Sequence, residues 1–214
     1  MPDMRHHGCR VAENPVMMVR ASEDYRMNRK RHVRRVVAAV GMLVLTSGIY
    51  LGGLQASGNF HEVKAGEFYR SAQPSPDALS RYIDQHGIRT VINLRGASPG
   101  RAWYDDEIKV SAAKGVEHID FPMSDRAILS PERSMELLAL MRDAPKPILI
   151  HCKAGADRTG LASVIYLQQL GGVDEETAEW QLSPLYGHVA LPGIGPYAMD
   201  TSWEDLEKVL GLDS

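Results

Sequence analysis

The stretch PILIHCKAGADRTG, residues 147–160, decides the fold of this chain. Its apolar beginning predicts a short buried strand, and the apolar residues that follow Gly160 predict a helix. A loop between the end of a strand and the start of a helix gathers unpaired backbone N–H groups, and the helix dipole adds positive potential. The stretch therefore predicts a strand, an anion-binding loop and a helix, an arrangement that suits a phosphate group.

The same loop carries side chains suited to phosphate chemistry. A cysteine at its base is favoured as the thiolate, which makes Cys152 the candidate nucleophile. Arg158 can donate two parallel hydrogen bonds to phosphate oxygens, and Gly155 removes a side chain where the loop turns tightly. A cysteine and an arginine alone are a weak signal, since they can equally be an inert thiol and a surface charge. Together with Thr159 and Gly160 before an apolar helix, they favour a phosphate-binding catalytic site.

Short apolar runs alternate with helical patterns from about residue 59 to the C-terminus, which is typical of an α/β domain. Strands are expected at Glu67–Arg70, Thr90–Leu94, Val116–Phe121 and Ile148–His151. Helices are expected from Pro76 to His86, from Pro131, from Gly160 to Leu170, after Asp174 and from Trp203 to Leu210, with a further helix start at Trp103. The pairs Ser75-Pro76 and Ser130-Pro131 each combine a capping serine with proline at the first helical position.

The segment His151–Gly160 resembles the phosphate-binding loop of the protein-tyrosine and dual-specificity phosphatase superfamily, whose members act through a cysteine. Three upstream segments are similar to a bacterial group of dual-specificity-like phosphatases that often carry a membrane anchor: Asn59–Val63, Tyr69–Pro74 and Thr90–Gly96. The resemblance covers about residues 59–190. It implies the cysteine-phosphatase fold, in which helices flank a central, mixed and mostly parallel sheet.

The resemblance also implies a mechanism, the hydrolysis of phosphomonoesters through a phosphocysteine intermediate. Cys152 would attack phosphorus while an acid protonates the leaving oxygen, and water would then hydrolyse the intermediate. His151 would support the loop and the thiolate, and Thr159 would assist the departure of the sulfur. The substrate would be bound by Lys153, Ala154, Gly155, Ala156, Asp157 and Arg158. Because Arg158 and the loop amides balance the phosphate charge, neither a metal nor a cofactor is expected.

The general acid has two candidates, Asp125 and Asp157. Asp125 follows the strand expected at Val116–Phe121, where related phosphatases carry their acid on a mobile loop. Asp157 lies directly before the Arg-Thr pair, as in the myotubularin-type lipid phosphatases. We place Asp125 first and Asp157 second; the alternative for Asp125 is a solvated turn residue paired with Arg126. Asp120 belongs to the strand and is expected to be structural.

The substrate depends on the neighbours of the cysteine. Lys153 and the two residues after it resemble the loop of phosphoinositide phosphatases of the tensin-homologue type, whereas the acidic Asp157 works against a polyanionic headgroup. We therefore expect a phosphorylated protein or a small phosphomonoester, with a phosphoinositide or inositol phosphate as the alternative. A non-catalytic, phosphate-binding adaptor is the rival class, against which the intact Cys152, Arg158 and Thr159 argue.

The N-terminal part of the chain predicts a membrane anchor. Residues 1–35 are polar and irregular in pattern, and they end in the basic run Arg29–Arg35. The uncharged run Val36–Leu54 follows, and about 20 apolar residues suffice to cross a bilayer as a helix. The positive-inside bias keeps the basic side in the cytoplasm. We expect a single-pass protein of the bacterial inner membrane with residues 59–214 on the periplasmic side; a signal cleaved after a start at Met27 is the alternative.

Composition argues against a nucleic-acid-binding protein and against a fold held by disulfides or a CxxC metal site. With 24 Lys and Arg against 27 Asp and Glu, the net charge of −3 provides no basic excess for a nucleic-acid partner. The two cysteines, Cys9 and Cys152, are too few for a disulfide framework or a CxxC metal site. The chain therefore has the composition of an ordinary globular protein with one candidate reactive thiol.

Overall fold

The computed structural model describes residues 15–191, 193 and 195–212, and their side chains from residue 29 onward. Cys9 lies outside the described residues. The chain divides into two compact units, Met1–Tyr50 and Leu51–Ser214. The second unit contains the sheet and every strand that the sequence predicts.

The second unit is built on a five-stranded sheet in the order β1-β2-β5-β3-β4. The strands are β1 (His61–Lys64), β2 (Phe68–Ser71), β3 (Thr90–Asn93), β4 (Glu117–Asp120) and β5 (Ile148–His151). Only β1 runs antiparallel to its neighbour, whereas β2, β5, β3 and β4 pair in parallel. This mixed, mostly parallel sheet confirms the expected fold class.

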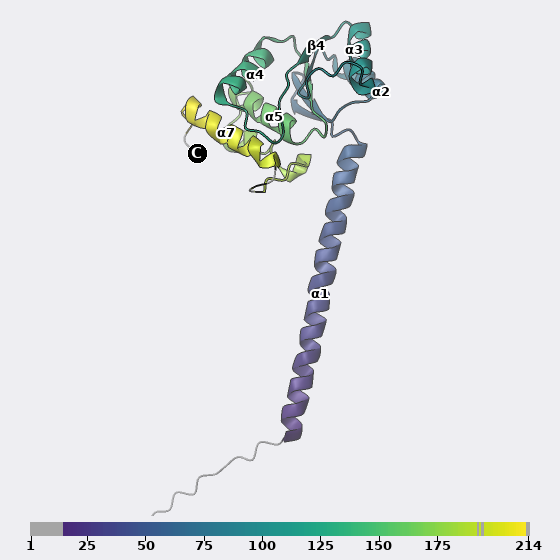
Figure 1. Ribbon diagram of the computed structural model, residues 1–214, viewed down its shortest axis with the longest axis vertical. Coiled ribbons are helices and arrows are strands. Elements are labelled where there is room, and N and C mark those ends of the chain that lie inside the picture. The colour runs from purple at the N-terminus through teal and green to yellow at the C-terminus, as the bar shows by residue number, and fades with distance from the viewer. Residues whose placement is uncertain (1–14, 192, 194, 213–214) are drawn as a thin grey trace, which may run out of the picture. The chain divides into compact units, whose positions relative to one another are not determined.

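Helices cover both faces of the sheet (Figure 1). One face packs against α4 (Pro131–Asp143), α5 (Asp157–Gln169) and α7 (Ala198–Leu210), beside the short α6 (Glu175–Glu179). The other face packs against α2 (Pro76–His86), which lies beside α3 (Ala102–Lys114). Two short 3-10 helices, η1 (Pro184–Tyr186) and η2 (Gly195–Tyr197), complete the C-terminal part.

The central strand β5 is buried along its whole length. Ile148 and Ile150 belong to the core under α4, α5 and α7, whereas Leu149 belongs to the smaller core under α2. A strand that is covered on both faces needs apolar residues on both, which is why this segment is a continuous apolar run. The strand is thereby fixed at the middle of the sheet and delivers Cys152 to its edge.

The helix starts at the two Ser-Pro pairs are confirmed. Ser75 Oγ accepts a hydrogen bond from Ala78 N at 3.2 Å before α2, and Ser130 Oγ accepts one from Arg133 N at 3.4 Å before α4. At the other end of α2, Gly87 has a φ of 63°, which glycine adopts without strain. Side-chain capping and a left-handed glycine are signals that depend on neighbours in sequence, so they can be predicted without the tertiary structure.

Other boundaries differ from the expectation. The strand β1 was not expected; it pairs with the edge of β2, where Tyr69 Oη donates to Glu62 Oε1 at 3.0 Å. The helix α5 begins at Asp157 and not at Gly160, so that Asp157 and Arg158 form its first turn. The helix α7 begins at Ala198 and not at Trp203. The other expected strands lie within one or two residues of those observed.

The helix α1 spans Pro15–Ala56, so it begins well before the uncharged run that starts at Val36. Proline suits the first helical position, and the residues that follow are rich in methionine and arginine, which favour helices. Within the described residues, Arg29–Ala56 is the one helical stretch long and apolar enough to cross a membrane. The hydroxyl of Thr46 donates to the carbonyls of Met42 and Leu43, both at 3.0 Å, so it is satisfied inside the helix.

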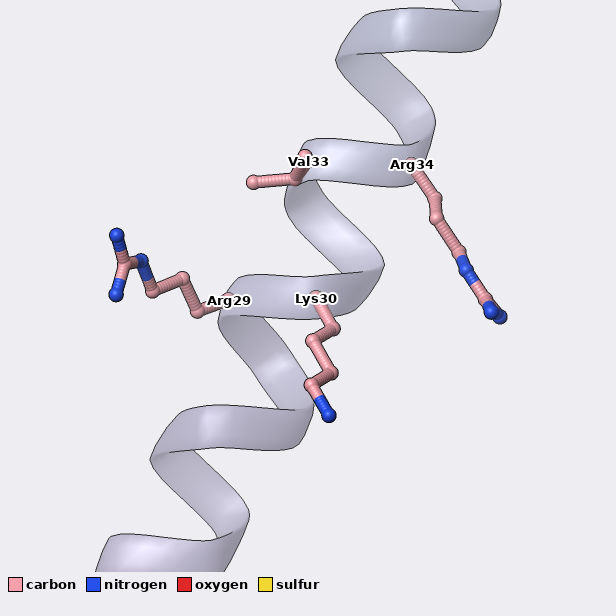
Figure 2. Close-up of a pocket in the computed structure, with 4 residues that line it drawn as sticks. All are labelled: Arg29, Lys30, Val33 and Arg34. Carbon is pink, nitrogen blue, oxygen red and sulfur yellow. The ribbon is translucent and has the colours of Figure 1, made fainter.

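The basic run lies on this helix. Figure 2 shows Arg29, Lys30 and Arg34 pointing away from the helix in different directions, beside Val33. All four side chains are exposed. Because the cationic groups do not converge, they form a charged flank of the apolar stretch and not an anion-binding site.

Candidate active site

The parallel strands end at one edge of the sheet, and the candidate site lies there. The residues that directly follow β2, β5, β3 and β4 are Ala72, Cys152, Leu94 and Phe121. In an open α/β sheet the carboxyl edge of the parallel strands is where ligands bind. The loop of residues 152–156 leaves this edge and enters α5.

Gly155 allows the loop to pass close to the neighbouring strand. Its φ is +70°, and a Cβ atom at this position would lie 2.5 Å from Ala72 N and 2.6 Å from the carbonyl carbon of Ser71. Any larger residue would push the loop away from the end of β2. The predicted role of Gly155, to allow a tight turn, is consistent with this geometry.

Cys152 lies at the base of the loop with 1% of its surface exposed. Its Sγ accepts a hydrogen bond from Gly155 N at 3.3 Å. The N-terminus of α5 begins five residues later and adds its dipole. The sulfur thus faces a hydrogen-bond donor at the positive end of a helix, a position that suits a nucleophile.

Arg158 is half-buried in the first turn of α5. Its Nη1 donates to Met123 O at 3.3 Å and to Leu94 O at 3.5 Å, which holds the guanidinium at the carboxyl edge. Its Nε is buried and has no partner among the described residues. The guanidinium is therefore anchored by one nitrogen and retains donors for an anion.

Thr159 and Lys153 provide further polar groups at the loop. The hydroxyl of Thr159 is buried without a hydrogen-bond partner in the part of the chain that the structure describes. Lys153 is exposed, Ala154 is half-buried and Ala156 is buried, so only the lysine of these three can present a charge to solvent. The structure thus brings the predicted loop residues together at one edge of the sheet.

His151 is fully buried at the end of β5 and contacts a carboxylate that the sequence did not point to. Its Nε2 lies 3.0 Å from Glu107 Oε1, which His118 Nε2 also approaches at 2.7 Å. Burial raises the pKa of Glu107, but the hydrogen bonds from His118 and His151 outweigh it and bring the pKa to about 2. Glu107 is therefore a carboxylate that fixes His151 behind the cysteine.

Hydrogen bonds also connect the carboxylate of Glu107, through Gln73, to Arg95. Gln73 Nε2 donates to Glu107 Oε2 at 2.5 Å, and Arg95 Nη1 donates to Gln73 Oε1 at 2.8 Å. The guanidinium of Arg95 lies 3.5 Å from the ring centre of Trp103. Burial, followed by the charge of Arg158, lowers the pKa of Arg95. The site thus has a second cation, close enough to Arg158 for their charges to interact.

Asp157 forms an ion pair with His188. Its Oδ1 lies 2.8 Å from Nδ1 of His188, and Nε2 of the same ring lies 3.0 Å from Asp200 Oδ2. A ring that donates from both nitrogens is the imidazolium. Burial lowers the pKa of His188, but the hydrogen bonds to Asp157 and Asp200 outweigh it and raise the pKa to about 9. Asp157 therefore links α5 to α7.

Asp125 lies between β4 and α4, two residues after the carbonyl of Met123 that Arg158 contacts. It is half-buried, and its carboxylate forms no hydrogen bond or ion pair with a described residue. The alternative role of Asp125, as a turn residue in an ion pair with Arg126, is not seen among the described residues. The backbone N–H of Arg126 donates instead to Ser124 Oγ at 3.0 Å. Asp125 thus has no described side-chain partner, and it lies two residues in sequence from the carbonyl that Arg158 contacts.

Asp120 is structural, as expected. Its Oδ1 accepts from Asn93 Nδ2 at 2.8 Å, and its Oδ2 accepts from Tyr104 Oη at 2.6 Å. The hydrogen bond to Asp120, followed by burial, raises the pKa of Tyr104 to about 12. Both oxygens of Asp120 are therefore occupied in joining β4 to β3 and α3.

A family model described as the tyrosine phosphatase family matches residues 50–186, more than half of the chain. The chain belongs to this family. It is a cysteine-dependent phosphatase, and its fold agrees with that membership.

The phosphatase is also similar to individual proteins. It is 28% identical to the human dual specificity protein phosphatase CDC14C over 97 residues, which are 45% of this chain and 20% of that protein. Among solved structures, TpbA of P. aeruginosa is 22% identical with a TM-score of 0.55, covering 73% of this chain and 92% of that chain. PTPMT1 is 16% identical with a TM-score of 0.53, covering 72% and 99%. These two likenesses support the fold.

Arg70 of the phosphatase was missed as a functional residue, although its segment was noted. It is fully buried, with Nη1 donating to Gln181 O at 2.9 Å and Oε1 at 2.8 Å, and Nη2 donating to Gly155 O at 2.8 Å and Ala156 O at 3.2 Å. Burial lowers the pKa of Arg70 to about 10. A buried cation is tolerated only when it is well paired, and this one is paired with the phosphate loop itself.

Asn59 is a second support that was missed. Its Nδ2 donates to Ala154 O at 3.1 Å and to Tyr186 O at 2.9 Å, and Gln55 Nε2 donates to Ala154 O at 3.1 Å. Asn59 is fully buried with a φ of 45°, a left-handed conformation that asparagine tolerates better than most residues. The only sequence signal was an asparagine after a glycine; its partner at Ala154 is distant in sequence.

Proposed function

We propose that this phosphatase hydrolyses phosphomonoesters through a phosphocysteine intermediate formed at Cys152. The observation that carries the proposal is the position of the sulfur. It lies at the end of the central strand and accepts a hydrogen bond from Gly155 N at 3.3 Å, beside the first turn of α5 and Arg158. A phosphate in this loop would meet backbone N–H groups, a guanidinium and the nucleophile together.

In the first step the Cys152 thiolate attacks phosphorus, forming an S–P bond while the bond to the leaving oxygen breaks. Arg158 and the loop amides stabilise the charge on the three equatorial oxygens. The general acid gives its proton to the leaving oxygen. In the second step the same residue takes a proton from water, whose oxygen attacks phosphorus and releases the thiolate, with the Thr159 hydroxyl as a donor to the departing sulfur.

We assign the acid to Asp125. An acid must be able to hold a proton and reach the leaving group, and the carboxylate of Asp125 is free of partners among the described residues. Asp157 instead pairs with the imidazolium of His188 at 2.8 Å, so its carboxylate already has a partner. Asp157 therefore acts as a positioning residue for the loop.

Phosphorylated proteins, above all those with phosphotyrosine, are the proposed substrates. The family description and a solved complex of a TpbA variant with pTyr support this class. A phosphoinositide is the second candidate, because PTPMT1 has been solved with PI(5)P. The ion pair between Asp157 and His188 favours a phosphoinositide substrate, because the balanced charge of Asp157 does not oppose a polyanionic headgroup.

The test is turnover by the full chain in detergent, with an aryl phosphate first and then matched phosphotyrosine, phosphoserine and phosphoinositide substrates. Wild type should hydrolyse the aryl phosphate, and Cys152→Ser should be inactive. The control Ser124→Ala, beside the acid, should retain activity. Wild type without turnover, or Cys152→Ser with equal turnover, would leave only a phosphate-binding adaptor.

For the N-terminal unit we propose a single span of the bacterial inner membrane, with the phosphatase unit on the periplasmic side. The apolar helical stretch Arg29–Ala56 and the exposed basic side chains at its start, in the run Arg29–Arg35, support an anchor whose basic end stays in the cytoplasm. A reporter enzyme that is active only in the periplasm, fused after Ser214, should be active. A reporter active only from the cytoplasm at the same position would reverse the orientation.

A further inference from the structure

Three carboxylates meet between α6 and α7, outside the candidate active site. Glu175 and Glu179 lie one helical turn apart on α6, and Glu207 lies on α7. Each offers an oxygen, and these oxygens all lie within 4.8 Å of one another. Ordinary surface acids avoid such proximity, because like charges at this separation repel.

Glu207 shows that the cluster is more than an acidic surface. It is 3% exposed, and its Oε1 is buried without a hydrogen-bond partner in the described part of the chain. Trp203, one turn earlier on α7, donates from Nε1 to Glu179 Oε1 at 2.9 Å and orients that carboxylate. A buried, unpaired carboxylate oxygen is costly unless something satisfies it.

The described residues supply no cationic side chain to the cluster. Lys208, the neighbour of Glu207 in sequence, is exposed and pairs with Asp205 at 2.9 Å. No described lysine, arginine or histidine forms an ion pair with any of the three glutamates. The balancing charge must therefore come from a proton or from a bound cation.

We propose that Glu175, Glu179 and Glu207 bind one calcium ion, which joins α6 to α7. Carboxylate oxygens are ligands for hard cations, and calcium accepts them at about 2.3–2.6 Å in a flexible geometry. Three oxygens within 4.8 Å of one another can all contact one ion at such bond lengths. Magnesium demands near-ideal octahedral geometry at about 2.0–2.1 Å, which three side chains on two helices are less suited to supply than the flexible geometry that calcium accepts.

An ion bound between α6 and α7 would affect the residues that support the phosphate loop. The helix α6 ends at Glu179, and two residues later Gln181 receives both hydrogen bonds from Nη1 of Arg70. Arg70 in turn holds the carbonyls of Gly155 and Ala156. Calcium would thus stabilise the segment on which the support of the phosphate loop depends, without touching the loop.

Terbium luminescence tests the site directly, because terbium takes the place of calcium and is excited through a nearby tryptophan. The full chain in detergent, freed of metal by a chelator, should show terbium emission on excitation of tryptophan, since Trp203 contacts a ligand. Calcium should displace the signal. In the absence of terbium, 10 mM calcium should raise the Tm by roughly 5 °C, and magnesium by less.

Matched variants on α7 decide the outcome. Glu207→Gln should lose the emission and the calcium-dependent rise in Tm, whereas Glu204→Gln, an exposed acid on the same helix, should keep both. Glu175→Gln is the second variant, and the Tm of each in chelator shows that it folds. The proposal is overturned if wild type shows neither response, or if Glu204→Gln loses as much as Glu207→Gln. Neither readout uses turnover, so the site can fail while the proposed activity stands.

Discussion

Two arginines beside the phosphate loop differ in how many donors they have left. Arg158 contacts two backbone carbonyls through Nη1 alone, and its Nε has no described partner. Arg70 engages four oxygens through its two terminal nitrogens. Residue by residue, therefore, Arg158 is suited to bind the phosphate, and Arg70 is suited to shape the loop that binds it.

We predict that Arg70→Lys damages both stability and turnover. A lysine keeps the charge but has one nitrogen, which cannot reach Gln181 and the loop carbonyls together. Breaking a buried charged network costs about 3 kcal/mol of unfolding free energy, and a displaced loop lowers kcat by about 100-fold. Urea unfolding and steady-state kinetics measure the two. Arg81→Lys on the exposed face of α2 is the control, and an Arg70→Lys protein as stable as wild type would contradict the prediction.

The two aspartates should respond differently to the leaving group. Asp125→Asn should lower kcat about 100-fold or more for an alkyl phosphate and much less for p-nitrophenyl phosphate, because a good leaving group needs no proton. The pH–rate profile should also lose its basic limb. Asp157→Asn should lower both rates by the same factor, since its effect passes through the loop. A leaving-group dependence in Asp157→Asn, with none in Asp125→Asn, would exchange the roles.

The sequence was sufficient for residues that act close to the cysteine and insufficient for those that act from a distance. Cys152 and Arg158 are six residues apart, so their spacing is visible. Arg70 and Gln181 are 111 residues apart, and Asp157 and His188 are 31 apart. Neither pair leaves a local pattern, because nothing near an arginine or a histidine in sequence says whether it is buried or which group it meets.

At the scale of elements, the same distinction separates the helix starts that were predicted from those that were not. The starts of α2 and α4 depend on a serine and a proline next to each other. The start of α5 has no side-chain cap, and its first turn is fixed by the ion pair between Asp157 and His188. The strand β1 similarly exists because β2 offers it an edge, which is a tertiary condition.

The link between α5 and α7 should make stability depend on pH. The pKa of His188 rises from 6.5 to about 9 on folding, so protonation favours the folded state. The stabilisation is complete below pH 6.5 and is lost as pH rises from 6.5 through 9. His188→Gln should lower the unfolding free energy by about 2 kcal/mol at pH 6 and by less at pH 9.

Urea unfolding of wild type and His188→Gln at pH 6, 7.5 and 9 measures this difference. The gap between the two proteins is the informative quantity, because other groups titrate in the same range in both. Gln85→Ala on the exposed surface of α2 removes no titratable group and is the control, and its gap from wild type should not change with pH. A gap between wild type and His188→Gln that stays constant from pH 6 to pH 9 would mean that the ring is neutral in the folded protein.

At the scale of the whole molecule, the last turns of α1 belong to the phosphatase unit, which begins at Leu51. Leu54 is 9% exposed, and Gln55 donates to Ala154 O at 3.1 Å. Gly58 O accepts from Ala72 N at 2.8 Å. The domain start expected at residue 59 would leave these contacts out, because the uncharged run in the sequence gives no sign of where a membrane segment ends and a core residue begins.

We therefore predict that a fragment of residues 59–214 is less stable than one of residues 51–214. Burial of Leu54 contributes about 2 kcal/mol, and the hydrogen bonds of Gln55 and Gly58 contribute about 1 kcal/mol together. The Tm should fall by roughly 8 °C, as followed by circular dichroism. Leu54→Ala in the longer fragment should reproduce about two thirds of the loss, whereas Leu51→Ala should have little effect because Leu51 is exposed. Equal Tm values for the two fragments would show that the phosphatase unit folds without the end of α1, and the support of Ala154 would then rest on Asn59 alone.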